Sequence, residues 1–426
     1  MIAPERPRTA GYSTHAKPVR EPSIPLPWGE DKSESRGVRR QEFLPTSTIE
    51  PGKCPDQALW GARQRHSAVA APLADLERRL ILGCRGRLAP GGRFGPRGRV
   101  HGSDRGTHVR AVVYDRYGPP EVLRVDDVPT PSPAAGQVLV QVAATSVNLS
   151  DWESLRGSPL YARLGGLRSP ARRTLGSDIA GWVDTVGEGV TRFRPGDEVY
   201  GDNLALKGGF AEYAVAAESA LAHKPAELTF AEASTIPQAG AIALQGTDGA
   251  AAGRRVLVNG AGGGSGSFGI QLAKRLGAHV TGVDNAAKLE FMRSLGADEV
   301  IDYRSEDFTR PVQPYDLILD LVAHRSVFAY RRALASGGRY RCVGGSVRAL
   351  LRVMTIGWIA GRLTSRRMGV LAVREGPSHF ELLADLCITG DIGIHIHRTF
   401  GLDDVRAALA HVGEGHALGK VVVTIT

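Results

Sequence analysis

The sequence has few cysteines and no long apolar run. Its four cysteines are widely spaced, at Cys54, Cys84, Cys342 and Cys387, and no two of them form a CxxC pair. This spacing argues against a disulfide framework and against a structural zinc site, so we expect a reducing, cytoplasmic location. No stretch approaches the roughly 18 consecutive apolar residues of a membrane span. We therefore expect no membrane partner.

Basic residues outnumber acidic residues by 19 to 11 in the first quarter of the chain. The whole sequence carries a formal net charge of +9, and residues 1–108 alone account for +8 of it. The same stretch holds 12 of the 25 prolines and has no sustained periodicity. This composition predicts a disordered basic extension, which a misassigned start codon with translation beginning at Val109 would explain. Aromatic residues are not interleaved with its basic residues, so a nucleic-acid partner is not expected.

Glycine, in contrast, is abundant, and it is concentrated between Arg254 and Asp284. The run Val256–Val258 is typical of a buried parallel strand. Five glycines follow between Asn259 and Gly266, then apolar residues at helical spacing, and then a second apolar run, Val280–Val283. Strand, glycine turn, helix and strand together are the context of a dinucleotide site. The alternative is a glycine-rich loop that binds nothing.

Each residue type of this turn has a physical role in such a site. Gly263 and Gly264 let the backbone turn tightly and approach a pyrophosphate, which the helix N-terminus attracts. Gly266 lets the helix pack on the strand, and Asp284 ends the second strand, where an acid accepts hydrogen bonds from a ribose. The predicted cofactor-binding residues here are Asn259, Gly263, Gly264, Ser265, Gly266 and Asp284.

The regions on either side of this unit differ in their pattern. From Val109 to about Leu228, short strands alternate with Gly/Pro turns, which predicts a compact, mostly β domain. After Asp284, strands and helices alternate, which predicts a doubly wound parallel sheet. The segment Leu350–Leu371 contains several arginines and predicts a surface-packed helix or a cofactor lid. The final run, KVVVTIT, predicts a strand that returns to the first domain.

Residues 109–426 resemble the medium-chain dehydrogenase/reductase superfamily, specifically its zinc-less quinone oxidoreductase-like branch. The resemblance is carried in order by YGPPEVL, SVNLSDWESLRG, LGSDIAGWVDTVGEGVTRFRPGDEVYG, GGFAEYA, AGGGSG, LGADEVIDY and GHALGKVVV. It implies an α/β fold in which a GroES-like catalytic domain (109–229) precedes a Rossmann NAD(P)-binding domain (230–372), with residues 373–426 returning to the catalytic domain. It also implies an active site between the two domains and a homodimer formed through Rossmann sheet edges.

The resemblance also bears on zinc. Metal-dependent members have a cysteine where this chain has Asn148 and a His-Glu pair where it has Ser177-Asp178. They also carry a four-cysteine lobe after the turn that is RPGDEVYG here. Because zinc favours thiolate and imidazole ligands, we expect no metal. His395 and His397 lie two apart, without a third partner in view.

Without a metal, the chemistry that best fits the cleft is hydride transfer from NAD(P)H to an activated C=C of a small quinone or enone. The candidate catalytic residues are Asn148 as an amide donor, Asp151 as its orienting neighbour and Tyr161 as a hydroxyl donor. Each has a structural alternative: a turn for Asn148, a helix cap for Asp151 and cleft packing for Tyr161. Relatives with a tyrosine in this region place it about two residues earlier, where this chain has Pro159.

The coenzyme signals conflict. Asp284 repels a 2′-phosphate and favours NAD(H), whereas Lys288 and Tyr303 match positions that relatives use around that phosphate. Ser265, where relatives have valine, adds a hydroxyl near the phosphates. A surface lysine is easily solvated, so we expect a slight preference for NAD(H). Two alternative functions stay open: a zinc-less alcohol dehydrogenase, and a non-catalytic dinucleotide sensor or nucleic-acid binder.

Overall fold

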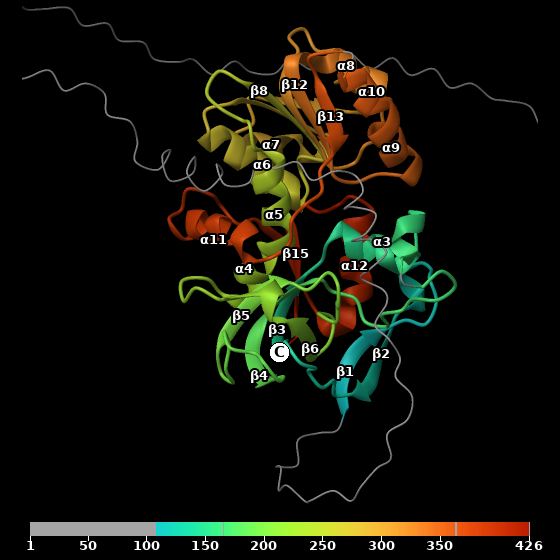
Figure 1. The fold of residues 1–426 in the computed structure, drawn as a ribbon, viewed down its shortest axis with the longest axis vertical. Helices are drawn as coiled ribbons and strands as arrows, with labels where there is room; N and C mark the ends of the chain where they lie inside the picture. The colour runs from blue at the N-terminus through green and yellow to red at the C-terminus, as the bar shows by residue number, and fades with distance from the viewer. Residues whose placement is uncertain (1–107, 165, 363, 426) are drawn as a thin grey trace, which may run out of the picture. The chain divides into compact units, whose positions relative to one another are not determined.

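The computed structural model describes residues 108–164, 166–362 and 364–425. Residues 1–107, on which the predicted disordered extension falls, lie outside the described residues. Over the described part, strands form a seven-stranded sheet, a six-stranded parallel sheet and a two-stranded hairpin. The predicted fold class, a β domain joined to a doubly wound parallel sheet, is confirmed (Figure 1).

The seven-stranded sheet is built from two distant parts of the chain. Its strands run in the order β14-β15-β3-β4-β5-β7, and β6 pairs with β3. The C-terminal strand pairs antiparallel with β3, with Val422 opposite Ser146, so the predicted return of KVVVTIT to the first domain is confirmed. The strands are β3 (Gln137–Ser146), β4 (Asp178–Val186), β5 (Glu198–Asp202), β6 (Tyr213–Ala217), β7 (Leu221–His223), β14 (Ile396–Gly401) and β15 (Lys420–Thr424).

The six-stranded sheet is parallel throughout, in the order β10-β9-β8-β11-β12-β13. The chain moves outward from β8 to β10 and then crosses back to β11, so the strand order reverses between β8 and β11. Ligands bind at such a reversal, beyond the carboxyl ends of the strands. The strands are β8 (Arg255–Asn259), β9 (His279–Asp284), β10 (Glu299–Asp302), β11 (Tyr315–Asp320), β12 (Leu334–Cys342) and β13 (Arg367–Val370).

Short helices connect and cover these strands. A hairpin, β1 (His108–Val113) with β2 (Arg124–Pro129), precedes them. None of the described helices is long and apolar enough to cross a bilayer. The helices are α3 (Leu149–Arg156), α4 (Phe230–Thr235), α5 (Pro237–Gly246), α6 (Gly264–Arg275), α7 (Leu289–Ser294), α8 (Val327–Ala333), α9 (Val347–Arg352), α10 (Trp358–Arg362), α11 (Glu381–Ile388) and α12 (Val405–Gly413).

One predicted segment differs from the structure. The helix expected over Leu350–Leu371 ends at Arg362, and Arg367–Val370 forms β13, the last strand of the parallel sheet. This strand has arginine at one end and only one β-branched residue, so its sequence has little strand propensity. Pairing with β12, where Tyr340 faces Met368 in the register, determines its conformation instead.

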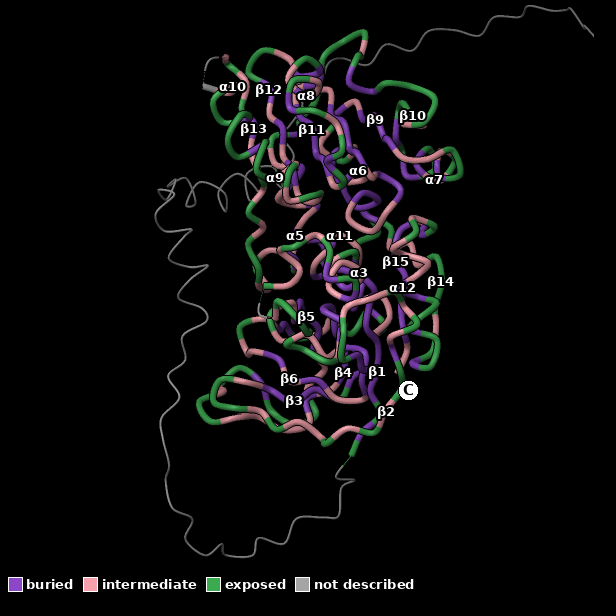
Figure 2. Tube along the Cα trace, turned by 90° about the vertical axis from the view of Figure 1, so that its right-hand side faces the viewer, coloured by how far each residue is buried: buried purple, intermediate pink, exposed green. Residues whose placement is uncertain are grey.

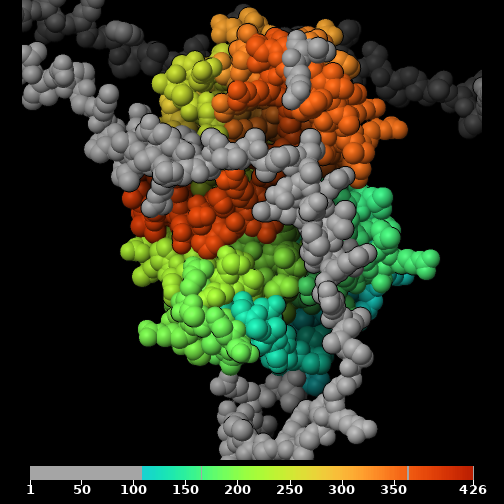
Figure 3. All heavy atoms as spheres, in the orientation of Figure 1, coloured from blue at the N-terminus to red at the C-terminus, as the bar shows by residue number. Residues whose placement is uncertain are grey.

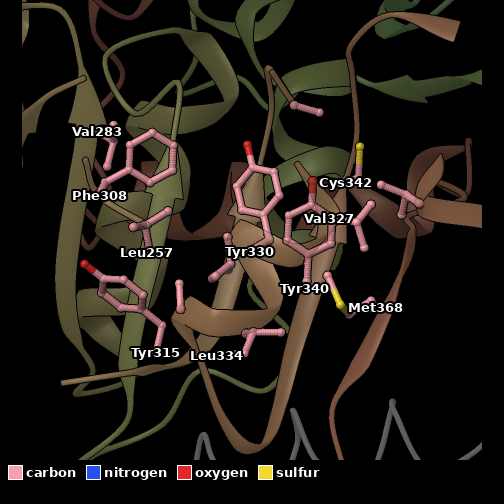
Figure 4. Packing of buried hydrophobic residues seen from close by; sticks show 14 of the residues in the cluster. Leu257, Val283, Phe308, Tyr315, Val327, Tyr330, Leu334, Tyr340, Cys342 and Met368 are labelled. Atoms are coloured by element: carbon pink, nitrogen blue, oxygen red, sulfur yellow. The ribbon is translucent and has the colours of Figure 1, made fainter. Parts of the chain in front are cut away.

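Apolar packing joins the two sheets. One buried cluster contains Tyr200 of β5, Phe268 of α6, Leu383 of α11 and Phe380 just before α11, so the seven-stranded sheet packs against helix α6 of the parallel-sheet part. The red C-terminal segment accordingly lies between the orange and green parts in Figure 3. A second cluster lies under the parallel sheet, where the rings of Tyr330 and Tyr340 are 4.5 Å apart (Figure 4). Figure 2 shows the resulting buried strands in purple.

Candidate active site

The glycine turn between β8 and α6 has the geometry that a dinucleotide requires. Gly260 adopts a left-handed φ of 84°, and a Cβ on Gly266 would lie 2.3 Å from the Gly260 carbonyl oxygen and 2.6 Å from Ala261 Cα. Only glycine therefore lets α6 pack against the turn at Gly266. Next to Gly263 the nearest atom to a Cβ is 3.5 Å away, so this side of the turn is open. The first N–H groups of α6 have no partner within the helix, so the helix N-terminus suits a pyrophosphate.

The residues expected around the adenosine ribose lie together. The Asp284 carboxylate accepts hydrogen bonds from the backbone N–H of Gly262 (3.0 Å) and of Asn285 (2.9 Å). The ammonium of Lys288 lies 3.5 Å from the same carboxylate. The backbone N–H of Tyr303 donates to the Asp284 carbonyl at 3.1 Å. Asp284, Lys288 and Tyr303 thus form one group beside the glycine turn.

The expectation that Lys288 is a solvated surface lysine is wrong. Its exposed fraction is only 6%, because its chain runs across Gly262, where a Cβ would lie 2.5 Å from Lys288 Cδ. A buried lysine is therefore paired with Asp284. Its positive charge offsets the negative charge of Asp284, which would repel a 2′-phosphate.

The side chain of Asn259 forms a hydrogen bond within the protein. Its amide donates to Asp320 at 2.7 Å, across the carboxyl ends of β8 and β11. The buried Asp320 also accepts from the Tyr340 hydroxyl (2.8 Å) and from the backbone N–H of Ala323 (2.8 Å). Sequence reasoning missed Asp320, although an acid at the end of the apolar run LILD was a usable signal. The pair joins β8 and β11 at the point where the strand order reverses.

A second polar cluster, hereafter the amide cluster, consists of Asn148, Ser177, Asp178 and Lys420. The Asn148 amide nitrogen donates to Asp178 at 2.8 Å and to Ser177 Oγ at 3.2 Å, and its oxygen accepts from Lys420 Nζ at 2.7 Å. Ser146 Oγ also donates to Asp178, at 2.9 Å. All four members are buried. Sequence reasoning missed Lys420, whose one signal was a charge at the head of the apolar run KVVVT.

Asp151 anchors the segment that carries Asn148. Its buried carboxylate accepts from the backbone N–H of Asn148 (3.0 Å) and of Gly176 (3.1 Å). Burial raises the pKa of Asp151, and Lys207 and these two hydrogen bonds oppose that effect. The geometry combines both alternatives considered for this residue, because the carboxylate caps α3 and also fixes the backbone of Asn148.

Tyr161 lies apart from the amide cluster. Its hydroxyl is 3.1 Å from both carboxylate oxygens of Glu153 and 3.3 Å from the carbonyl oxygen of Gly345. Burial raises the pKa of Tyr161, and the neighbouring Glu153 raises it further. The hydroxyl therefore links α3 to the turn after β12.

The donor atoms of the amide cluster do not suit zinc. Asn148 and Ser177-Asp178 come together, but they offer an amide, a hydroxyl and one carboxylate, and the Lys420 ammonium already lies 3.5 Å from that carboxylate. A buried ammonium repels a second cation, and zinc favours thiolate and imidazole. Elsewhere His397 lies 3.0 Å from His411, a partner that the sequence did not reveal. Over the described ranges, no three histidine, cysteine or acidic residues are grouped to hold a metal.

Comparisons with known proteins agree with this architecture. Residues 134–226 match the family model for the alcohol dehydrogenase GroES-like domain, and residues 295–423 match that for zinc-binding dehydrogenases. The chain is 32% identical to quinone-oxidoreductase QR1, chloroplastic, of Triphysaria versicolor, over 75% of this chain and 99% of that protein. It is also 32% identical to the mitochondrial NAD(P)H oxidoreductase RTN4IP1 of Homo sapiens, over 76% and 91%. The quinone oxidoreductase structure from Coxiella burnetii superposes with a TM-score of 0.68 at 30% identity, over 75% and 100%.

Fold, site and relatives define one class. The chain belongs to the medium-chain dehydrogenase/reductase superfamily, in its quinone oxidoreductase-like branch. It is an NAD(P)-dependent oxidoreductase.

Proposed function

We propose that this enzyme reduces the activated C=C bond of a small quinone or enone with NAD(P)H, without zinc and with a slight preference for NADH. The observation that carries the proposal is the amide cluster, in which an amide, a hydroxyl and a carboxylate stand where metal-dependent relatives have metal ligands, and a buried ammonium contacts the amide and the carboxylate. The quinone oxidoreductases to which the chain is similar support the substrate class.

The chain's own residues orient the substrate and stabilise its oxygen. When bound, the reduced nicotinamide supplies a hydride. Asn148 can exchange its longer bond, to Ser177 at 3.2 Å, for one to the substrate carbonyl oxygen while it keeps the 2.8 Å bond to Asp178. Donors aimed at an oxygen that gains negative charge lower the barrier in a site that excludes water. Asp151 fixes the backbone from which this amide projects.

The coenzyme preference rests on Asp284. A carboxylate at the end of β9 can accept hydrogen bonds from a ribose and disfavours a phosphate on it. The pairing with Lys288 weakens that discrimination, so the preference for NADH over NADPH is proposed to be small. A cytoplasmic location and a homodimer stay predictions.

Steady-state kinetics of the full-length protein test the proposal. Oxidation of NADH and NADPH is followed by absorbance with a small quinone and with an α,β-unsaturated ketone, before and after treatment with a chelator. We expect turnover of both acceptors, unchanged by the chelator and somewhat faster with NADH.

Three results would contradict it. Loss of rate on chelation would contradict zinc independence. Alcohol oxidation in the absence of quinone turnover would favour a zinc-less alcohol dehydrogenase. Nucleotide binding without turnover of any acceptor would favour a dinucleotide sensor.

A further inference from the structure

Lys420 is a buried cation at the start of an otherwise apolar strand. Its exposed fraction is 2%, and its ammonium lies 2.7 Å from Asn148 Oδ1 and 3.5 Å from Asp178 Oδ2. Burial lowers the pKa of Lys420, and the carboxylates of Asp178 and Asp151 oppose that effect. An unpaired ammonium in this position would be strongly destabilising, so its two acceptors are required.

The ammonium determines which end of the Asn148 amide faces which neighbour. A lysine ammonium only donates hydrogen bonds, so the amide atom 2.7 Å from it must be the oxygen. The amide nitrogen then points to Asp178 and Ser177, both of which accept. If the amide turned over, its NH₂ group would face the ammonium and its oxygen would face a carboxylate. Lys420, at the oxygen, and Asp178, at the nitrogen, therefore fix the orientation in which Asn148 can donate.

The methylene chain of Lys420 lies against the glycine turn. A Cβ on Gly264 would lie 2.7 Å from Lys420 Cδ. One residue earlier, the backbone N–H of Gly419 donates to the Gly262 carbonyl at 2.9 Å, and Gly263 pairs with Gly419 in a parallel bridge. The backbone that carries Lys420 is thus attached to the turn that would receive the pyrophosphate.

We propose that Lys420 is a positioning residue that aligns the Asn148 amide with the glycine turn, so that the donor to the substrate oxygen is set relative to the bound nucleotide. This rests on the proposed role of Asn148 in the reduction. Lys420 acts through Asn148, because its own ammonium is enclosed by the cluster. The ammonium contacts Asn148 and the methylene chain lies against Gly264, and this makes the two contacts separable by mutation.

Lys420→Met separates these two contacts. Methionine keeps an unbranched chain against Gly264 and removes the ammonium. We expect the dissociation constant for NADH, measured by fluorescence titration, to stay within about threefold of the wild type, and kcat for quinone reduction to fall roughly a hundredfold with little change in KM. Asn148→Ala should have a similar effect on kcat, and the double variant should lose no more than either single variant.

A readout without substrate tests the amide directly. Hydrogen exchange of the Asn148 side-chain amide, followed by NMR, should be slow in the wild type and at least about tenfold faster in Lys420→Met, because the amide then loses the bond to its oxygen and is held only through its nitrogen, by Asp178 and Ser177. Lys420→Arg keeps an obligatory donor and should restore the protection, and it also carries the test if the methionine variant does not fold. Lys224→Met removes another buried ammonium, whose side chain is 4% exposed, and should leave the Asn148 amide protected.

Several outcomes would overturn the proposal. They are unchanged amide exchange and kcat in Lys420→Met, additive losses in the double variant, or a loss confined to nucleotide affinity. If the wild type reduces neither acceptor, the proposed function fails, but amide exchange still decides whether Lys420 holds Asn148 in place.

Discussion

Two buried carboxylates, Asp178 and Asp202, strongly affect the electrostatics of this site. Asp178 and Asp202 lie directly opposite each other on β4 and β5, and both are buried. Burial raises the pKa of Asp202, and the charges of Asp178 and Glu375 raise it further. In the amide cluster, the ammonium of Lys420 lies 3.5 Å from the carboxylate of Asp178. Asp202 has no cation bonded to it in this cluster. The cost of burying its charge therefore depends on pH.

Replacing this acid should change the pH dependence of stability. The folded state binds the Asp202 proton more readily than the unfolded state does, so stability falls as pH rises from the ordinary range of an aspartate through the raised pKa. Asp202→Asn keeps the oxygen that accepts from Leu204 N–H. We expect it to have a higher Tm than the wild type at neutral pH and a flatter profile of Tm against pH.

Calorimetry from mildly acidic to neutral pH would measure this difference. Asp126→Asn, at a carboxylate whose side chain is 44% exposed, serves as the control and should follow the wild type. A wild-type Tm that rises over this range together with a destabilised Asp202→Asn would contradict the assignment.

Among the elements, the turn into α6 is tightly packed at one glycine and open at another. The atoms nearest a Cβ at Gly266 are backbone, which cannot move aside, whereas the space around Gly263 is open. Gly266→Ala should lower the free energy of unfolding by about 1–3 kcal/mol or more, since overpacking against backbone forces the helix away from the strand. Gly263→Ala should keep stability within about 1 kcal/mol of the wild type but weaken NADH binding.

Urea unfolding with parallel nucleotide titration would separate the two effects. Equal destabilisation by both alanines would show that the packing argument is wrong. Unchanged nucleotide affinity in Gly263→Ala would place the pyrophosphate elsewhere.

The sequence predicted those elements that local patterns determine. The predicted strand runs Val256–Val258 and Val280–Val283 lie within β8 and β9, and the helix expected between them is α6. Strand β13 and the start of β12 at Leu334 were not predicted, because pairing with neighbouring strands sets their conformation.

The features of the site that the sequence did not predict depend on contacts between residues that are distant in the chain. Asn148 and Asp151 were predicted from the sequence of their segment and from the family resemblance. Lys420 is far from Asn148 in the chain, and no local pattern links the two residues. Burial of Lys288 depends on the neighbouring glycine Gly262, which leaves room for its chain. Such contacts are set by tertiary packing, which a one-dimensional pattern does not contain.

For the whole molecule, the terminal strand of the parallel sheet offers a surface for self-association. Strand β13 pairs with β12 on one side, and Val370 at its end is 36% exposed. We expect the wild type to be a homodimer through this edge by light scattering. Val370→Lys should raise the dimer dissociation constant by roughly tenfold or more, because like charges meet across a two-fold axis.

Val312→Lys provides the matched control, since Val312 is fully exposed in a loop. It should leave the dimer intact. A wild-type mass of one chain at micromolar concentration would refute the predicted dimer.

The pairing of β15 with β3 also determines whether the two domains can be separated by cutting the chain. The parallel sheet and its helices are an insertion within the seven-stranded sheet, whose strands precede and follow it in the chain. Closing so long an intervening segment has an entropic cost, although each doubling of its length adds only about 0.6 kcal/mol. A chain cut after β7 would leave β3 without its β15 neighbour and would lack Lys420. The nucleotide-binding part is therefore a continuous insertion between the two ends of the β domain, whereas the β domain cannot be excised with a single cut.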